Sequence, residues 1–189
     1  HQFQHTVAGV VFAKPGYVAP EGAELSVPEA MDISKEPAHI HEMYGSEPGK
    51  TSFANNCLLA RRLVEAGVPF IVLQEGSWDH HSELFGTLRR QLPPFDEVVA
   101  TLILDLEQRG LLDSTLVVFT SEFGRSPWSQ NITGRDHNPK GYTSWFAGGG
   151  IKGGTVHGAT DEFGYRAVES PHYYSDLHAT ILHQLGLDY

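Results

Sequence analysis

Helical and extended segments alternate regularly between residues 51 and 120, and this alternation limits the possible folds more than any other feature of the chain. Apolar side chains recur at helical spacing in residues 53–64 and again in residues 95–106. A short apolar run follows each of them, at residues 69–74 and 115–120, and is interpreted as a buried strand. Helix, strand, helix, strand in that order is typical of α/β proteins whose neighbouring strands run parallel.

Glycines and prolines set the expected limits of these elements. Gly67 is expected to end the first helix, because glycine readily adopts the left-handed conformation that closes a helix. The second helix is expected to begin near Ser82, to be broken or restarted at Pro93-Pro94, and to end before Gly110.

A third strand is expected at residues 142–147, directly before a run of glycines. Residues 123–141, which connect it to the second strand, show no helical period, so they lack the crossover helix that a parallel return requires. The third strand is therefore predicted to run antiparallel. A short strand at residues 7–13 and a last helix capped by Ser175-Asp176 complete the expected elements.

The composition argues against several classes of function. The formal net charge is −10, which disfavours nucleic acid and anionic membrane surfaces as partners, because both require clustered cations. The sequence has no apolar run long enough for a transmembrane helix, and no signal peptide is visible. The one cysteine, Cys57, rules out an internal disulfide and is expected to be buried in the first helix.

Asp79 and His81 follow the first predicted strand and form the first candidate site. Residues two apart share a face of an extended chain, so both side chains can reach one ion while His80 points away. A carboxylate with an imidazole suits Zn²⁺, Mn²⁺ or Fe²⁺ better than Ca²⁺. The alternative is that these residues only cap the helix that begins near Ser82.

The second predicted strand and the loop after it supply the other candidates. Glu122 lies at the strand end, where it can ligate a metal or act as a general base, and Arg125 can hold an anionic substrate. The alternative is a surface pair between these two. His137 can supply a third ligand, and Asp136, like His80, is expected to orient a ligand from outside. The alternative there is a turn aspartate beside an exposed histidine.

Several ordered motifs resemble one bacterial family, the domain-of-unknown-function family number fifteen-hundred-and-one. The motifs are Trp78-Asp-His-His81, Ser121-Glu-Phe-Gly-Arg125, Gly134-Arg-Asp-His137, Ala147-Gly-Gly-Gly-Ile-Lys-Gly-Gly154 and Ser175-Asp-Leu-His-Ala-Thr-Ile-Leu-His-Gln-Leu-Gly-Leu187. The resemblance covers residues 30–189. The family is similar to a sulfatase-like branch of the alkaline phosphatase superfamily.

The resemblance implies a mostly parallel sheet between helices, with one antiparallel strand, and metal-assisted hydrolysis of phosphate or sulfate esters. Asp79 and His81 resemble an Asp/His pair of one metal, and His137 resembles its distant third ligand. Glu122 stands where the superfamily often has an aspartate that binds a second metal. Phe123 occupies the place of a histidine there and cannot ligate.

The resemblance also implies that the fold is incomplete. Superfamily members place a first strand, a metal-binding aspartate and a nucleophile upstream of these motifs, and residues 1–50 contain no such pattern. Full family proteins are longer and often carry a twin-arginine export signal. We therefore expect residues 1–30 to be an irregular segment and residues 31–189 to be the C-terminal part of an alkaline phosphatase-like domain from a periplasmic or extracellular protein.

The combined hypothesis is a metal-dependent hydrolase-like domain with a divalent cation, Zn, Mn, Fe or Ca, held by Asp79, His81, His137 and Glu122. Glu122 and Arg125 would act in catalysis. The expected partners are a small sulfated or phosphorylated ester, and either a separate N-terminal half or a second copy of the chain. One alternative is water activation by a single metal without a covalent intermediate. Another is a catalytically inactive sulfatase-like binding or structural subunit.

Overall fold

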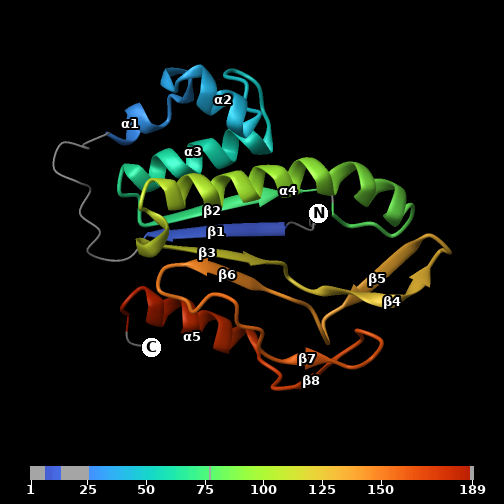
Figure 1. The fold of residues 1–189 in the computed structure, drawn as a ribbon. Helices are drawn as coiled ribbons and strands as arrows, with labels where there is room; N and C mark the ends of the chain where they lie inside the picture. Colours follow the sequence, from blue (N-terminus) through green and yellow to red (C-terminus); the bar gives the residue numbers. More distant parts are fainter. Residues whose placement is uncertain (1–6, 14–25, 77, 188–189) are drawn as a thin grey trace.

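The computed structural model describes residues 7–13, 26–76 and 78–187 (Figure 1). The helices are α1 (Val27–Ala30), α2 (Ala38–Tyr44), α3 (Phe53–Glu65), α4 (Leu84–Gln108) and α5 (Tyr174–Gln184), with 3₁₀ turns η1 (Ile33–Lys35) and η2 (Leu112–Ser114). The strands are β1 (Val7–Ala13), β2 (Phe70–Glu75), β3 (Thr115–Thr120), β4 (Gly124–Gln130), β5 (Gly134–Asn138), β6 (Trp145–Gly148), β7 (Ala159–Thr160) and β8 (Ala167–Glu169).

The main sheet has four strands in the order β2-β1-β3-β6, and all of its neighbouring strands run antiparallel. The expectation of a mostly parallel sheet is therefore wrong. β2 and β3, which α4 connects, do run in the same direction, but β1 lies between them and pairs with both. The prediction that β6 runs antiparallel to β3 is confirmed, because a hairpin rather than a crossover helix joins them.

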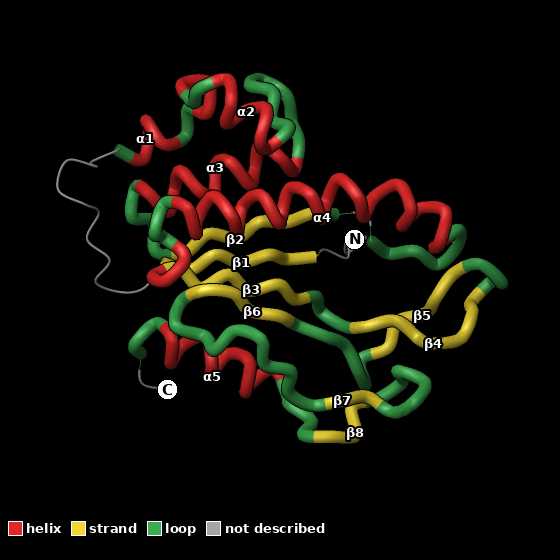
Figure 2. The backbone as a smooth tube through the Cα atoms, in the orientation of Figure 1, coloured by secondary structure: helices red, strands yellow, loops and turns green. Residues whose placement is uncertain are grey.

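Helices cover both faces of this sheet, with α3 and α4 on one face and α5 on the other (Figure 2). The central strand β3 alternates its side chains between the two layers. Val117 belongs to the core under α3 and α4, whereas Leu116 and Val118 pack against Ile181 of α5 and Leu185 at its C-terminal end. A strand buried on both faces has to be apolar throughout, which is how the sequence identified it.

A group of buried charges ties α3 to the segment before it and to α4. The side chain of Arg61 is 1% exposed, and its guanidinium contacts Glu36 and Glu65 at 2.6 Å and Asp105 at 3.0 Å. Arg62 also contacts Glu36. Buried charge is tolerated only where opposite charge compensates it, and here Arg61, Arg62 and Arg109 share the three carboxylates. The network fixes the position of η1 and α2 over α3.

The proline pair does not interrupt α4, so that prediction is wrong. Pro93 and Pro94 lie inside a continuous 25-residue helix. Each proline removes one helical hydrogen bond, which leaves the carbonyls of Arg89 and Arg90 without a partner from the helix. All four residues are exposed, so water can satisfy the freed carbonyls.

The segment that joins β3 to β6 was expected to be irregular, and it forms the antiparallel hairpin β4–β5 instead. Asn131 and Ile132 at its turn both have positive φ, 47° and 68°, which is the geometry of tight hairpin turns. Figure 1 shows this hairpin extending from the sheet toward the start of α4. The backbone of Leu84 at the start of α4 donates to the carbonyl of Thr133, 3.0 Å away.

Candidate metal centre

The loop between β2 and α4 supplies two of the candidate ligands. Asp79 and His81 lie in this loop, and the Trp78 ring packs edge-on against Phe95 of α4 at 5.2 Å. The Trp78 ring therefore anchors this loop against α4. The Asp-x-His spacing lets the two side chains point the same way while His80 is buried on the other side.

The hairpin β4–β5 supplies the third ligand. His137 on β5 pairs directly with Arg125 on β4, so both side chains reach the same place from neighbouring strands. Both side chains contact Asp79, whose Oδ1 atom lies 2.8 Å from His137 Nε2 and 2.6 Å from an Arg125 nitrogen. Two segments more than 40 residues apart in sequence thus meet at one carboxylate.

Asp79 Oδ1, His81 Nε2 and His137 Nε2 form a nearly equilateral triangle. The oxygen lies 2.9 Å from His81 Nε2 and 2.8 Å from His137 Nε2, and the two nitrogens are 3.0 Å apart. A tetrahedral ion with bonds of about 2.0–2.1 Å keeps neighbouring ligand atoms about 3.3–3.4 Å apart. The donor set therefore fits a divalent cation after a movement of a few tenths of an ångström.

The site is open to solvent on one side. The three ligand side chains are between 31% and 36% exposed. Within the part of the chain that the structure describes, they are the one set of three or more potential ligands whose donor atoms lie within 4.8 Å of one another. Open coordination positions beside three protein ligands are characteristic of catalytic rather than structural metal centres.

Two opposing effects act on the Asp79 carboxyl. Burial raises its pKa, but the hydrogen bonds from His137 and Arg125 outweigh burial and lower the pKa to about 2. Arg125 also donates to the backbone carbonyls of Trp78 and Arg135. Arg125 thus joins the loop to the hairpin and keeps the candidate ligand ionised.

The backbone of the loop lies very close to the backbone of the hairpin. A Cβ atom built on Gly134 would lie 2.0 Å from the carbonyl oxygen of His81, a distance that no real side chain tolerates. The neighbouring Arg135 donates its backbone N–H to the carbonyl of His80 at 3.2 Å. Glycine is therefore required at position 134, because any larger residue would push the two backbones apart.

The family comparison agrees with the motifs from which the site is built. A family model described as "Protein of unknown function (DUF1501)" matches residues 16–189. The chain belongs to this family. Neither the curated proteins nor the solved structures gave a match to the DUF1501 chain.

The structure places the other predicted site residues of this DUF1501 chain around the triad. His80 is 8% exposed, and its Nδ1 lies 2.9 Å from the carbonyl of Trp78. Asp136 is exposed, and its carboxylate accepts the backbone N–H of His137 at 2.8 Å. Glu122 is also exposed, its backbone carbonyl accepts from Tyr174, and its carboxylate does not belong to the group of three. Three of the four predicted ligands therefore come together.

Two residues of the site were missed by sequence reasoning. Gln130, at the end of β4, places its Oε1 atom 2.5 Å from His81 Nδ1. Phe123 packs its ring on His137, with the ring centroids 4.3 Å apart. Phe123 was noted only as a residue that cannot ligate, and Gln130 gave no signal because its segment was expected to be a loop.

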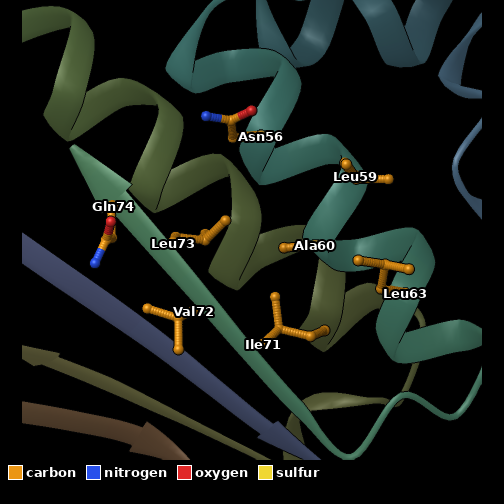
Figure 3. A pocket seen from close by; sticks show the side chains of 8 residues that line it. All are labelled: Asn56, Leu59, Ala60, Leu63, Ile71, Val72, Leu73 and Gln74. Carbon is orange, nitrogen blue, oxygen red and sulfur yellow. The ribbon is translucent and has the colours of Figure 1, made fainter.

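A hollow of about 610 Å³ lies elsewhere in the DUF1501 chain, between α3 and β2 (Figure 3). Its lining residues are Asn56, Leu59, Ala60, Leu63, Ile71, Val72, Leu73 and Gln74. None of them is titratable, so this hollow has no groups for acid–base or metal chemistry. Among the described residues, no helix is both long and apolar enough to cross a membrane.

Proposed function

We propose that this chain is a metal-dependent hydrolase-like domain that acts on phosphate or sulfate esters. The observation that carries the proposal is the convergence of Asp79, His81 and His137 on a triangle with edges of 2.8–3.0 Å. Two imidazoles and one carboxylate suit Zn²⁺, Mn²⁺ and Fe²⁺. When bound, such an ion supplies Lewis acidity that polarises an ester oxygen and acidifies water.

The residues of the chain contribute binding and orientation to this chemistry. Asp79, His81 and His137 would hold the ion and leave its solvent side open to an anionic ester. Arg125 holds the Asp79 carboxylate at 2.6 Å and keeps it ionised. The catalytic roles expected for Glu122 and for Arg125 stay predictions. Glu122 lies on the β3–β4 connection, one residue from the Phe123 ring that packs on His137.

The finer parts of the proposal depend on the resemblance to sulfatases. They are the choice of phosphate or sulfate esters, the relation of this chain to the C-terminal half of a longer fold, and an exported parent protein. Activation of water by a single metal, without a covalent intermediate, is the alternative form of the reaction, for which Asp79, His81 and His137 would supply the ligands.

Metal analysis of the purified protein tests the proposal. We expect about one equivalent of Zn²⁺ or Mn²⁺ per chain, with binding weakened at least tenfold in Asp79→Ala and in His137→Ala. His183→Ala is the matched control, because it removes an exposed imidazole from α5, outside the group of three candidate ligands. Unchanged metal content in both site variants would refute the proposal.

A second function, a catalytically inactive sulfatase-like binding subunit, is favoured by one specific observation. Asp79 Oδ1 already lies 2.6 Å from an Arg125 nitrogen and 2.8 Å from His137 Nε2, so the carboxylate has two hydrogen-bond donors without an ion. Assays with aryl phosphates and aryl sulfates separate the two functions. Metal binding without turnover of either substrate class would favour the inactive subunit.

A further inference from the structure

We infer that Gln130 is a positioning residue that holds the His81 imidazole by its Nδ1 atom and so directs Nε2 toward the metal. The inference rests on the proposed function, because it concerns the same candidate centre. Gln130 belongs to β4, whereas His81 belongs to the loop before α4, 49 residues earlier. The contact is therefore a tertiary one.

The contact determines which nitrogen of His81 carries hydrogen. Gln130 Oε1 lies 2.5 Å from His81 Nδ1, and a carbonyl oxygen can only accept a hydrogen bond. With the Gln130 amide in this orientation, Nδ1 is the donor. A neutral imidazole has one N–H and one lone pair, so the lone pair then belongs to Nε2.

His81 Nε2 is the atom that faces the other ligands. It lies 2.9 Å from Asp79 Oδ1 and 3.0 Å from His137 Nε2. A hydrogen bond at one ring nitrogen and the metal position at the other is the usual arrangement of a metal-binding histidine. Gln130 thus supplies the outer contact that was predicted for His80 and Asp136.

The backbone around this contact is fixed from both sides. Gln130 pairs with Gly134 across the hairpin, and Gly134 is the residue whose missing Cβ lets the His81 backbone approach. Gln130 and His81 are both half-buried. The hairpin and the adjoining loop therefore hold the Gln130 amide beside the His81 ring.

The test compares two substitutions at Gln130. Gln130→Leu keeps the size of the side chain and removes the acceptor, whereas Gln130→Glu keeps an acceptor at the same reach. Gln108→Leu, at the exposed end of α4, is the control for adding a leucine to the surface. The first readout is the Zn²⁺ affinity by calorimetry, and the second is the Nδ1–H proton of His81 by NMR in metal-free protein.

We expect Gln130→Leu to weaken Zn²⁺ binding about 10–100-fold, the usual effect of removing such an outer contact, while Gln130→Glu and the control bind like wild type. The His81 Nδ1–H proton should be slow to exchange in wild type, fast in Gln130→Leu, and slow again in Gln130→Glu. A circular dichroism spectrum matching wild type shows that Gln130→Leu is folded.

The two readouts separate this inference from the proposed function. If wild type binds no Zn²⁺ but the Nδ1–H proton loses protection in Gln130→Leu, Gln130 positions the ring and the metal proposal fails. If wild type binds Zn²⁺ and Gln130→Leu binds it equally well, the role of Gln130 is overturned. An Nδ1–H proton that is equally protected in both proteins overturns it as well.

Discussion

At the scale of single residues, the ionised carboxylate of Asp79 makes the stability of the fold depend on pH. Burial raises its pKa, and the contacts with His137 and Arg125 outweigh burial and lower the pKa to about 2. The ordinary pKa of an aspartate is about 3.9. Since the folded pKa is the lower one, the ionised carboxylate stabilises the fold above about pH 4, and this stabilisation is lost as the pH falls toward 2.

Asp79→Asn lacks the titrating group. The difference between its free energy of unfolding and that of wild type should therefore be constant above about pH 5. The difference should shrink between about pH 4 and pH 2, where wild-type Asp79 becomes protonated. Urea unfolding at a series of pH values measures it. A difference that stays flat down to pH 2 would contradict the ion pairs at Asp79.

Gly134 gives a second prediction at this scale. In Gly134→Ala the added Cβ would lie 2.0 Å from the His81 carbonyl oxygen and 2.1 Å from its carbon, so loop and hairpin must separate. We expect a loss of about 1–3 kcal/mol in the free energy of unfolding, as for other overpacked sites, together with weaker Zn²⁺ binding. Chemical denaturation and calorimetry measure the two effects.

Gly153→Ala is the matched control, because a Cβ there meets nothing within 4 Å. It should leave both the free energy of unfolding and Zn²⁺ binding close to wild type. If Gly134→Ala behaved like Gly153→Ala, the close approach between β5 and the His81 loop would not exist.

At the scale of elements, the buried charges around Arg61 predict how α3 is held. Arg61→Met removes the buried cation that contacts Glu36, Glu65 and Asp105 together. The three carboxylates then keep only the partly exposed Arg109, at Glu65 and Asp105, and Arg62, at Glu36. Breaking a buried pair in this way typically costs about 3–5 kcal/mol. The exposed pair of Lys50 and Glu47 is the comparison, and Lys50→Met should cost less than about 1 kcal/mol. Equal losses measured by urea unfolding would contradict the network.

Most single elements were predictable because their signals are local. Ser52 caps α3 by accepting from the backbone of Asn55, and Gly67 follows its end with a positive φ, as expected. The apolar run of β3 matched the predicted strand residue for residue. The two errors have physical causes: exposed prolines are tolerated where water satisfies the freed carbonyls, and the hairpin β4–β5 is polar and bulged, so it shows no regular alternation.

The candidate site was predictable to the extent that strand ends collect functional side chains. Asp79, His81 and His137 each lie near a predicted strand, and the structure brings them together. Gln130 and Gly134 were not predictable, because their roles depend on contacts between the hairpin and a loop about 50 residues earlier. Pairing over such distances leaves no periodic pattern in the sequence.

At the scale of the whole molecule, sheet order was the main error. Helix–strand alternation describes β2, α4 and β3 correctly, but it does not say that a distant strand lies between the two strands. β1 pairs over six residues with β2 and over six with β3, so it joins the two halves of the sheet. A local pattern cannot reveal this, because strand order depends on which edges meet in space.

The central place of β1 gives the last prediction. Val10 pairs with Val72 of β2 and with Val118 of β3, so a proline there disrupts the ladder of a central strand. Val10→Pro should lower the free energy of unfolding by about 3 kcal/mol or more. Thr160→Pro, in the two-residue strand β7 outside the main sheet, should cost much less. Hydrogen exchange should show faster opening of both β2 and β3 in Val10→Pro, because losing β1 separates them. Exchange that stays slow in both strands would mean that β2 and β3 do not depend on β1.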